Sequence, residues 1–267
     1  MMTKIAVVGG GTMGVTFIRA VTNSGIVDLS NLAVCEIVPE RREWLAAEFD
    51  GLCVTGDLAE AVDLCDAIYL SVKPQDLSTL ARDSGAQSRL LISILAGSTI
   101  SEVQASTGAE RIIRAMPNTP AQIGKGFTAW TATDGVTAEE RQLVSRLLDA
   151  MGEQLYVADE STIDKITAVS GSGPAYVFLI IEAMINAAVN IGLRPDDARR
   201  MVLQTVIGSS EFAQLSGEHL ATLKDMVTSP GGTTAAGLQV LEQRAVRSAL
   251  IDAVAAAHRR AEELGRQ

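Results

Sequence analysis

KIAVVGGGTMG, residues 4–14, is the stretch that decides the fold. Its first part, residues 4–10, is a continuous apolar run that predicts a buried β-strand, and a helical pattern follows directly. Between them, Gly9, Gly11 and Gly14 satisfy the spacing G-x-G-x-x-G. In that spacing the first glycine permits a tight turn, the second lets a pyrophosphate approach the backbone, and the third allows close helix–strand packing. Because the pattern closes a strand and opens a helix, it predicts a dinucleotide-binding site.

Short apolar runs alternate with helical patterns as far as residue 158. Strands are expected at 4–10, 31–36, 52–56, 67–72, 89–95, 111–116, 126–130 and 154–158. Helices are expected at 12–22, from Pro39, and at 75–82, 99–106 and 137–150. Continuously apolar strands separated by helices indicate a parallel sheet covered on both faces. We therefore expect residues 1–158 to form a Rossmann-type, doubly wound α/β domain.

Residues 159–267 carry a different pattern, because every segment has a helical period and none shows strand alternation. This predicts an all-helical domain. Its segment 174–191 is apolar on nearly every side except for a polar stripe of Glu182, Asn186 and Asn190. A helix of that kind needs more than one neighbour, so we expect the domain to bury its faces against a second copy of the chain. The polar stripe also makes the segment a poor membrane span.

Composition narrows the class of protein. The 267 residues carry a formal net charge of −10, whereas a nucleic-acid partner requires a basic face. The three cysteines, Cys35, Cys53 and Cys65, lack the spacing of metal ligands. We expect them to be reduced core residues of a cytoplasmic protein. Because the first expected strand begins at residue 4, no secretory signal is expected. The expected partners therefore include neither nucleic acid nor membrane, and no metal site is expected.

The second expected strand ends at Glu36, an acid about twenty residues beyond the glycine loop. An acid at that point can accept hydrogen bonds from the ribose hydroxyls of NAD(H). Arg41 and Arg42 follow closely and could instead meet the 2′-phosphate of NADP(H), or could form the solvated first turn of a helix. The choice between NADH and NADPH stays open.

Three loops directly follow expected strands, at 71–75, 95–99 and 115–121. Ligands of doubly wound sheets bind at the carboxyl ends of strands, so these loops should ring the cofactor. Lys73 is the charged residue at their centre, and its position fits a direct role as well as a surface lysine. His219 is expected on the surface, and no serine–histidine–acid or paired-carboxylate motif stands out. The chemistry of the site therefore does not call for a histidine.

Two glycine-rich loops interrupt the helical half, SGSGPAY at 170–176 and TSPGGTT at 228–234. In the first, Ser172 or Gly173 precedes Pro174 and could simply cap the next helix. Each loop is expected to open a helix whose free N–H groups suit a small anion.

Six motifs in their order along the chain resemble the pyrroline-5-carboxylate reductase family. They are GGGTMG (9–14), SVKPQ (71–75), AGSTIS (96–101), RAMPNTPA (114–121), AVSGSGPAY (168–176) and LKDMVTSPGGTT (223–234). The resemblance covers nearly the whole chain, and the last two motifs are specific to the family. It implies reduction of the cyclic imine 1-pyrroline-5-carboxylate to L-proline with NADPH or NADH, the last step of proline synthesis. It also implies a homodimer interlocked through the helical domain, and assembly of dimers into decamers.

The resemblance assigns roles residue by residue. For the cofactor it implies contacts from Gly9, Gly11, Thr12, Met13, Gly14, Glu36, Ser71, Val72, Lys73, Pro74, Ala96, Gly97, Met116, Pro117 and Asn118. For the substrate it implies contacts from Gly231, Gly232, Thr233, Thr234 and Ser172, with Thr234 and Lys73 as the catalytic candidates. The Thr234 hydroxyl would meet the imine nitrogen. Glu36 departs from the family pattern, in which a small polar residue is common where NADPH is preferred.

Two other functions share part of this sequence pattern. A β-hydroxyacid dehydrogenase shares the two-domain plan but removes an alcohol proton with a lysine, and 174–190 contains none. A cofactor-binding sensor protein would not need both intact loops, at 170–176 and 228–234. A protonated imine is already electrophilic, so its reduction needs alignment more than a strong acid, and a hydroxyl can relay a proton from water.

Overall fold

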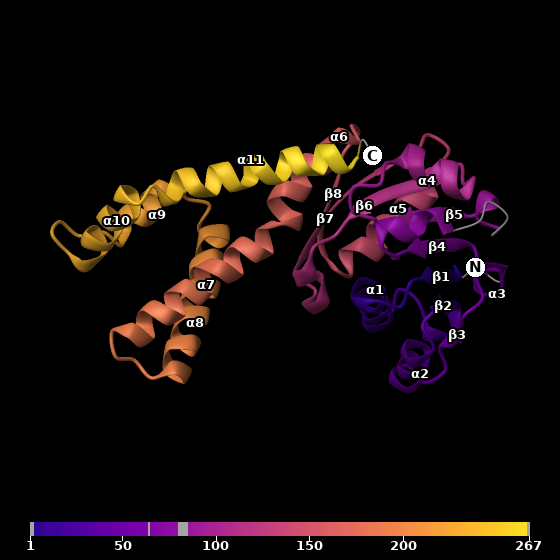
Figure 1. Cartoon of the computed structure of the whole chain (residues 1–267), viewed down its shortest axis with the longest axis horizontal. Helices are drawn as coiled ribbons and strands as arrows, with labels where there is room; N and C mark the ends of the chain where they lie inside the picture. The colour runs from indigo at the N-terminus through magenta and orange to yellow at the C-terminus, as the bar shows by residue number, and fades with distance from the viewer. Residues whose placement is uncertain (1–2, 64, 80–84, 266–267) are drawn as a thin grey trace. The chain divides into compact units, whose positions relative to one another are not determined.

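The computed structural model describes residues 3–63, 65–79 and 85–265 and divides into two compact units (Figure 1). The first unit runs to Ser172 and takes up the chain again from Ala257, and the second unit is Gly173–Ala256. The boundary between the two units thus follows Ser172. The sequence pattern places a domain boundary between residues 158 and 159, and that boundary stays a prediction.

The first unit is built on one eight-stranded sheet in the order β3-β2-β1-β4-β5-β6-β7-β8. Its strands are β1 (Ile5–Val8), β2 (Leu32–Cys35), β3 (Cys53–Thr55), β4 (Ala67–Leu70), β5 (Leu90–Ser93), β6 (Arg111–Met116), β7 (Gly126–Ala132) and β8 (Gly152–Tyr156). The chain order reverses at β1, which lies between β2 and β4. This reversal is the switch point at which doubly wound sheets bind their ligands, so the predicted fold class is confirmed.

The described strands pair in parallel except β6 and β7, which are antiparallel. The parallel sheet expected from the strands up to residue 116 is confirmed, whereas the direction of β7 was not predicted. Residues 117–125 join the two strands through the short 3-10 helix η4 (Thr119–Ile123). A parallel crossover needs about a dozen residues or more, so this connection can only turn the chain back.

Helices cover both faces of the sheet. The α-helices of this unit are α1 (Thr12–Asn23), α2 (Pro39–Glu48), α3 (Leu58–Asp63), α4 (Ile100–Thr107), α5 (Ala138–Asp149) and α6 (Ser161–Ile166), and the further 3-10 helices are η1 (Leu29–Asn31), η2 (Pro74–Thr79) and η3 (Ala86–Ser88). The helix expected at 75–82 is thus a 3-10 helix over its described part, and residues 80–82 lie outside the described residues.

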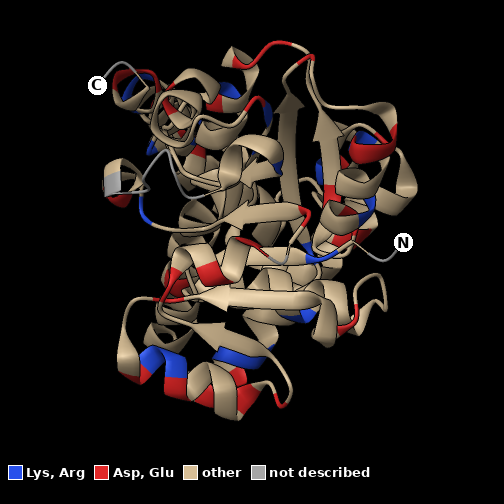
Figure 2. Cartoon of the chain, turned by 90° about the vertical axis from the view of Figure 1, so that its right-hand side faces the viewer, with Lys and Arg blue, Asp and Glu red and all other residues tan. Residues whose placement is uncertain are grey.

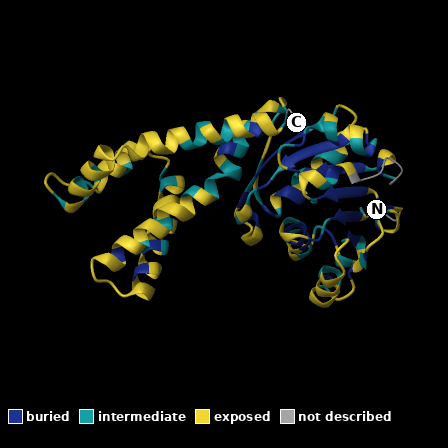
Figure 3. Ribbon diagram, viewed as in Figure 1, coloured by how far each residue is buried: buried dark blue, intermediate teal, exposed yellow. Residues whose placement is uncertain are grey.

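Alternate residues of each central strand enter two separate cores. Ile5 and Val7 of β1 belong to a cluster with α1 and α5, while Ala6 and Val8 belong to a cluster with α3 and α4. Both faces of the strand are therefore apolar, which explains the uninterrupted hydrophobic runs in the sequence. Figure 3 shows these strands as the buried centre of the unit.

The second unit, whose residues are all described, contains no strand. Its helices are α7 (Gly173–Asn190), α8 (Pro195–Ser216), α9 (Leu220–Met226), α10 (Thr233–Gln243) and α11 (Val246–Leu264), the last of which ends in the first unit. α7 and α8 pack side by side (Figure 1). Ala188, Ala198 and Val202 are buried in this unit, but most of its residues are exposed (Figure 3). The all-helical domain is confirmed, and it leaves much apolar surface uncovered.

The cysteines are free, and two of the three lie in the core. Burial raises the pKa of the Cys35 and Cys65 thiols, which keeps them protonated and unreactive near neutral pH. Cys53 is exposed on β3, so its assignment to the core is wrong. β3 is the terminal strand of the sheet, and its residues are correspondingly less covered.

Candidate functional site

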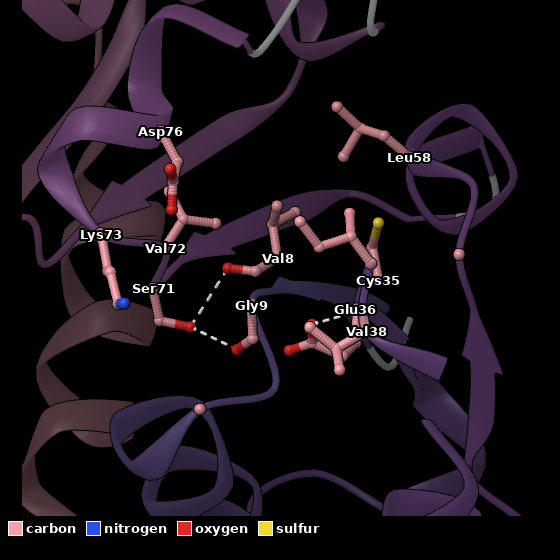
Figure 4. A pocket seen from close by; sticks show the side chains of 13 residues that line it. Val8, Gly9, Cys35, Glu36, Val38, Leu58, Ser71, Val72, Lys73 and Asp76 are labelled. Carbon is pink, nitrogen blue, oxygen red and sulfur yellow. Dashed lines mark hydrogen bonds between the residues drawn. The ribbon is translucent and has the colours of Figure 1, made fainter. Parts of the chain in front are cut away.

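A cavity of about 480 Å³ opens at the carboxyl ends of β1, β2 and β4 (Figure 4). The residues that line it are Val8, Gly9, Gly11, Cys35, Glu36, Ile37, Val38, Gly56, Leu58, Ser71, Val72, Lys73 and Asp76. The cavity therefore lies at the switch point, where the sequence predicts a dinucleotide. It contains the predicted cofactor residues Gly9, Gly11, Glu36, Ser71, Val72 and Lys73.

The glycine loop lies so close to the end of β4 that side chains do not fit on its inner side. Gly9 has φ +100°, and a Cβ there would stand 2.8 Å from the carbonyl oxygen of Ser71. A Cβ on Gly14 would collide with the carbonyl oxygen of Gly9. The Ser71 hydroxyl donates a hydrogen bond to that same Gly9 oxygen at 2.8 Å (Figure 4). Gly11 is different, because no described atom lies within 4 Å of its Cβ position. The loop is thus closed toward the protein and open toward a ligand.

The N-terminus of α1 is suited to an anion. Gly11 is the N-cap residue, and no described side chain caps the helix. The first turn contains no acidic residue, and Thr12 is exposed. Free N–H groups and the positive end of the helix dipole favour a phosphate at such a terminus. Figure 2 shows acidic and basic residues intermixed along the ribbon.

Glu36 lies next to the glycine loop, and two backbone N–H groups fix its carboxylate. Its Oε2 accepts a hydrogen bond from the Gly10 N–H at 2.9 Å, and its Oε1 accepts one from the Val38 N–H at 3.0 Å. A carboxylate has about four lone-pair sites, so both oxygens keep acceptor capacity. Glu36 is thereby placed to accept hydrogen bonds from hydroxyls of a ligand in the cavity.

Arg41 and Arg42 stabilise the protein around Glu36. Arg41 Nε donates to the carbonyl oxygen of Gly10 at 2.7 Å, and its guanidinium lies 4.0 Å from the Trp44 ring centre. Arg42 Nη1 donates to the carbonyl oxygens of Glu36 and Ile37, both at 2.9 Å. Neither arginine is among the described residues that line the cavity. The geometry favours a structural role for both over contact with a 2′-phosphate.

The loops after β4, β5 and β6 share one edge of the sheet, because these strands are neighbours and parallel. Only the first of these loops lines the cavity, through residues 71–73 and Asp76. Ala96 and Gly97 form a turn after β5, with Gly97 at φ +77°. The predicted cofactor residues outside the cavity lining are Thr12, Met13, Gly14, Pro74, Ala96, Gly97, Met116, Pro117 and Asn118.

Several lining residues were not predicted from the sequence. Ile37 and Val38 directly follow Glu36 and are 77% and 46% exposed. Two apolar residues directly after the acid at a strand end are a signal that sequence reasoning could have used. Gly56, Leu58 and Asp76 come from other segments, and only the folded sheet brings them to the cavity.

β6 also carries a buried arginine whose importance the sequence pattern did not reveal. Arg114 is 3% exposed, and its guanidinium pairs with Glu160 at 2.9 Å and with Asp164 at 2.6 Å. The same Glu160 oxygen accepts a hydrogen bond from the Ile100 N–H at 2.8 Å, at the start of α4. A charge within the apolar strand RIIRAM was the available signal, because a buried arginine requires partners.

The segment 170–176 is not a loop, so that prediction is wrong. Residues 167–171 form a π-helical turn, η5 (Thr167–Gly171), between α6 and α7. The Ser172 N–H donates to the carbonyl oxygen of Thr167 at 2.9 Å, five residues back. Pro174 has no N–H, so the α-helical bond to the carbonyl oxygen of Ser170 cannot form, and a π turn accommodates the irregularity. The free helix end expected near Ser172 is therefore absent from this described segment.

The loop at 228–234 does open a helix, as predicted. Gly231 has φ +70°, a conformation that glycine adopts readily. Gly232 is the N-cap of α10, and no described side chain caps that terminus. Thr233 is exposed and Thr234 is half-buried at the first two helical positions. The Gly232 N–H donates to the Ser229 carbonyl oxygen at 3.0 Å, so the N–H groups available to an anion are those of the first helical turn, from Thr233 on.

Comparisons with known proteins agree along the whole chain. Residues 160–264 match the sequence model described as pyrroline-5-carboxylate reductase dimerisation, and residues 4–97 match that described as NADP oxidoreductase, coenzyme F420-dependent. A pyrroline-5-carboxylate reductase of Synechocystis is 39% identical over 269 residues, which cover 100% of both chains.

Solved structures show the same similarity. A pyrroline-5-carboxylate reductase from Coxiella burnetii is 32% identical over 99% of each chain, with a TM-score of 0.88. The pyrroline carboxylate reductase of Plasmodium falciparum, solved with NADP bound, is 31% identical over 98% of each chain, with a TM-score of 0.89. With motifs, fold and cavity in agreement, the chain belongs to the pyrroline-5-carboxylate reductase family.

Proposed function

We infer that this chain reduces 1-pyrroline-5-carboxylate to L-proline with NADPH or NADH, the final step of proline synthesis. The observation that carries this inference is the full-length similarity to pyrroline-5-carboxylate reductases. A Rossmann cavity alone would serve many substrates, because folds of this class host many reactions. The loop at 228–234 belongs to the helical domain, whose residues 160–264 match the family's own sequence model. This match is what supports the particular substrate.

The residues at the switch point fit a nicotinamide dinucleotide, because the loop around Gly9 and Gly14 leaves no room for a Cβ while Gly11 is open. When bound, the cofactor supplies a hydride. The N–H groups of the first turn of α1 hold its pyrophosphate, and Glu36 accepts hydrogen bonds from its adenosine ribose. The loops after β4, β5 and β6, which include Lys73, then lie on the nicotinamide side.

The N-terminus of α10 receives the substrate carboxylate. Gly231 and Gly232 let the backbone N–H groups face the anion, and the helix dipole contributes about 0.3–2 kcal/mol. The Thr234 hydroxyl hydrogen-bonds the imine nitrogen. Hydride adds to the imine carbon, the electron pair of the C=N bond moves to nitrogen, and the resulting amine takes a proton from water through that hydroxyl.

Two further side chains keep proposed roles. Lys73 is exposed and lines the cavity, where its positive charge lies beside the cofactor and makes it the second catalytic candidate. Ser172, at the end of the π turn, remains a proposed substrate contact through its half-buried side chain.

A second copy of the chain covers the helical unit in this proposal, as a homodimer that assembles further into a decamer. Phe178 and Leu179 of α7 are 61% and 65% exposed. A groove of about 460 Å³ beside them is lined in part by Glu182, Asn186 and Arg199. The segment 161–190 is long and apolar enough to cross a membrane, but the charged residues of this groove favour a protein partner over lipid. Sedimentation velocity tests this: a folded monomer at micromolar concentration would contradict it.

The proposed compartment is the cytoplasm. All three cysteines are free, and such thiols are typical of a reducing compartment. The formal net charge of −10 argues against a nucleic-acid partner.

The test of the function is oxidation of NADH or NADPH by the purified chain with 1-pyrroline-5-carboxylate. We expect turnover that saturates in the pyrroline and yields L-proline. Cofactor binding without any turnover, with either dinucleotide, would contradict the proposed reaction and would favour the sensor alternative.

A further inference from the structure

Asn118, just beyond the end of β6, has its whole side-chain amide engaged by the protein. Its Nδ2 donates to the carbonyl oxygen of Ser170 and lies 3.1 Å from both that oxygen and the Ser170 hydroxyl. Its Oδ1 accepts a hydrogen bond from the Phe127 N–H at 2.9 Å. One amide therefore joins three segments, namely the loop after β6, the start of β7 and the π turn.

The carbonyl oxygen that Asn118 binds is the one left without its α-helical donor. In a regular helix the N–H of residue 174 would donate to the carbonyl oxygen of Ser170, but Pro174 has no N–H. A buried carbonyl oxygen that is left without a donor destabilises the fold. Asn118 supplies a donor from a different part of the chain, and it does so where the helix changes from π to α geometry.

The same strand holds the same helical segment at a second point. Arg114 lies four positions before Asn118 and pairs with Glu160 and Asp164 at the start of α6. The backbone at Gly171, the last residue of the turn, also lies close to β6, because a Cβ there would stand 3.5 Å from Met116 Cε. The end of β6 and the residue just beyond it therefore hold this segment at two points, by the ion pairs of Arg114 before the π turn and by the Asn118 amide at Ser170 within it.

We propose that Asn118 is a positioning residue, which sets the place of Ser170–Ser172 beside the nicotinamide edge of the sheet and does not itself contact the cofactor. This rests on the proposed function. β6 follows β4 and β5 along that edge, so a turn fixed to the end of β6 is fixed relative to the nicotinamide side. π turns persist where the surroundings determine them and occur frequently at functional sites.

The experiment compares three variants with the wild type. Asn118→Asp keeps the acceptor for the Phe127 N–H but loses both donors, Asn118→Ala loses all three interactions, and Ser170→Ala loses only the hydroxyl partner. The matched control is Gln122→Ala, an exposed amide on the same loop whose described bond is to the nearby Thr119 carbonyl oxygen.

For both Asn118 variants we expect kcat/KM for the pyrroline to fall about 10- to 100-fold, since a misplacement of about 1 Å can reduce a rate by two orders of magnitude. Ser170→Ala should give a smaller loss in the same direction, and Gln122→Ala should give none. The dissociation constant for NADH or NADPH, measured by fluorescence titration without substrate, should change by less than about twofold in every variant. Hydrogen exchange across residues 166–173 should be faster in the Asn118 variants than in the control.

Two results would overturn the proposal. A cofactor dissociation constant weakened tenfold or more by Asn118→Asp would show that Asn118 contacts the cofactor. Unchanged kinetics with unchanged exchange at 166–173 would show that the amide positions nothing. Hydrogen exchange can be measured without turnover. An inactive wild type would therefore refute the proposed reaction, and the exchange rates at 166–173 would still test the effect of Asn118 on the π turn.

Discussion

Replacing Glu36 by glutamine should shift cofactor use toward NADPH. The Glu36 carboxylate lines the cavity at the end of β2 and is held by the N–H groups of Gly10 and Val38. A 2′-phosphate on the adenosine ribose would bring negative charge against it. Glutamine has nearly the same shape but carries no charge, so the substitution removes the repulsion. Its single amide oxygen can accept from only one of these two N–H groups, so one backbone hydrogen bond is lost as well.

Two effects set the magnitude. Two unit charges about 4 Å apart interact by about 1 kcal/mol in water and about 4 kcal/mol near a protein surface, and the lower part of that range applies to this half-buried, open position. A hydrogen bond to a charged acceptor is also worth about 1 kcal/mol more than one to a neutral acceptor, which weakens the binding of NADH. Together they give about 2 kcal/mol, or about a 30-fold change in the NADPH-to-NADH ratio of kcat/KM.

The assay is initial-rate reduction of 1-pyrroline-5-carboxylate with each cofactor. Glu36→Ser should shift the ratio in the same direction, because it also removes the charge. The control is Glu40→Gln, an exposed acid in the first turn of α2 that is not among the described residues lining the cavity. A ratio that changes less than about threefold in Glu36→Gln, or equally in the control, would refute the role of the carboxylate.

Three other substitutions test separate parts of the structure. Thr234→Ala should lower kcat/KM for the pyrroline by about 1–3 kcal/mol, about 5- to 150-fold, while Thr234→Ser retains most activity; equal losses in both would contradict a hydrogen bond from the hydroxyl. Tyr69→Phe should not lower the free energy of unfolding in urea, because the fully buried Tyr69 hydroxyl has no partner among the described residues; a loss above about 1 kcal/mol would contradict this. Arg114→Met should lower the free energy of unfolding by about 3 kcal/mol, because it leaves two acids unpaired. Arg19→Met, at an exposed ion pair, should lower it by less than about 1 kcal/mol. Similar losses in both variants would refute the difference between a buried and an exposed ion pair.

Local patterns were enough to predict the first strand, the glycine turn and the helix that follows it. The strand at β1, the glycine turn and α1 are adjacent in the sequence, and the roles of Gly9, Gly11 and Gly14 depend on a few neighbouring backbone atoms. Glu36 was predictable for the same reason, because a strand end places it at a known edge of the sheet.

Features that depend on distant partners were missed. The π turn follows from Pro174 together with Asn118, which are far apart in the sequence and meet only in the folded chain. Arg114 has the same character, because its partners lie on α6. The direction of β7 was also not predicted, although the short connection after β6 contained that information.

The proposed reaction transfers a hydride from the nicotinamide cofactor to the imine carbon of 1-pyrroline-5-carboxylate. It is tested most directly by single-turnover reduction with cofactor deuterated at the transferred position, followed by mass spectrometry and NMR of the product. We predict L-proline that carries one deuterium, on the δ-carbon that was the imine carbon. Proline without deuterium, or no proline with either cofactor, would contradict the account.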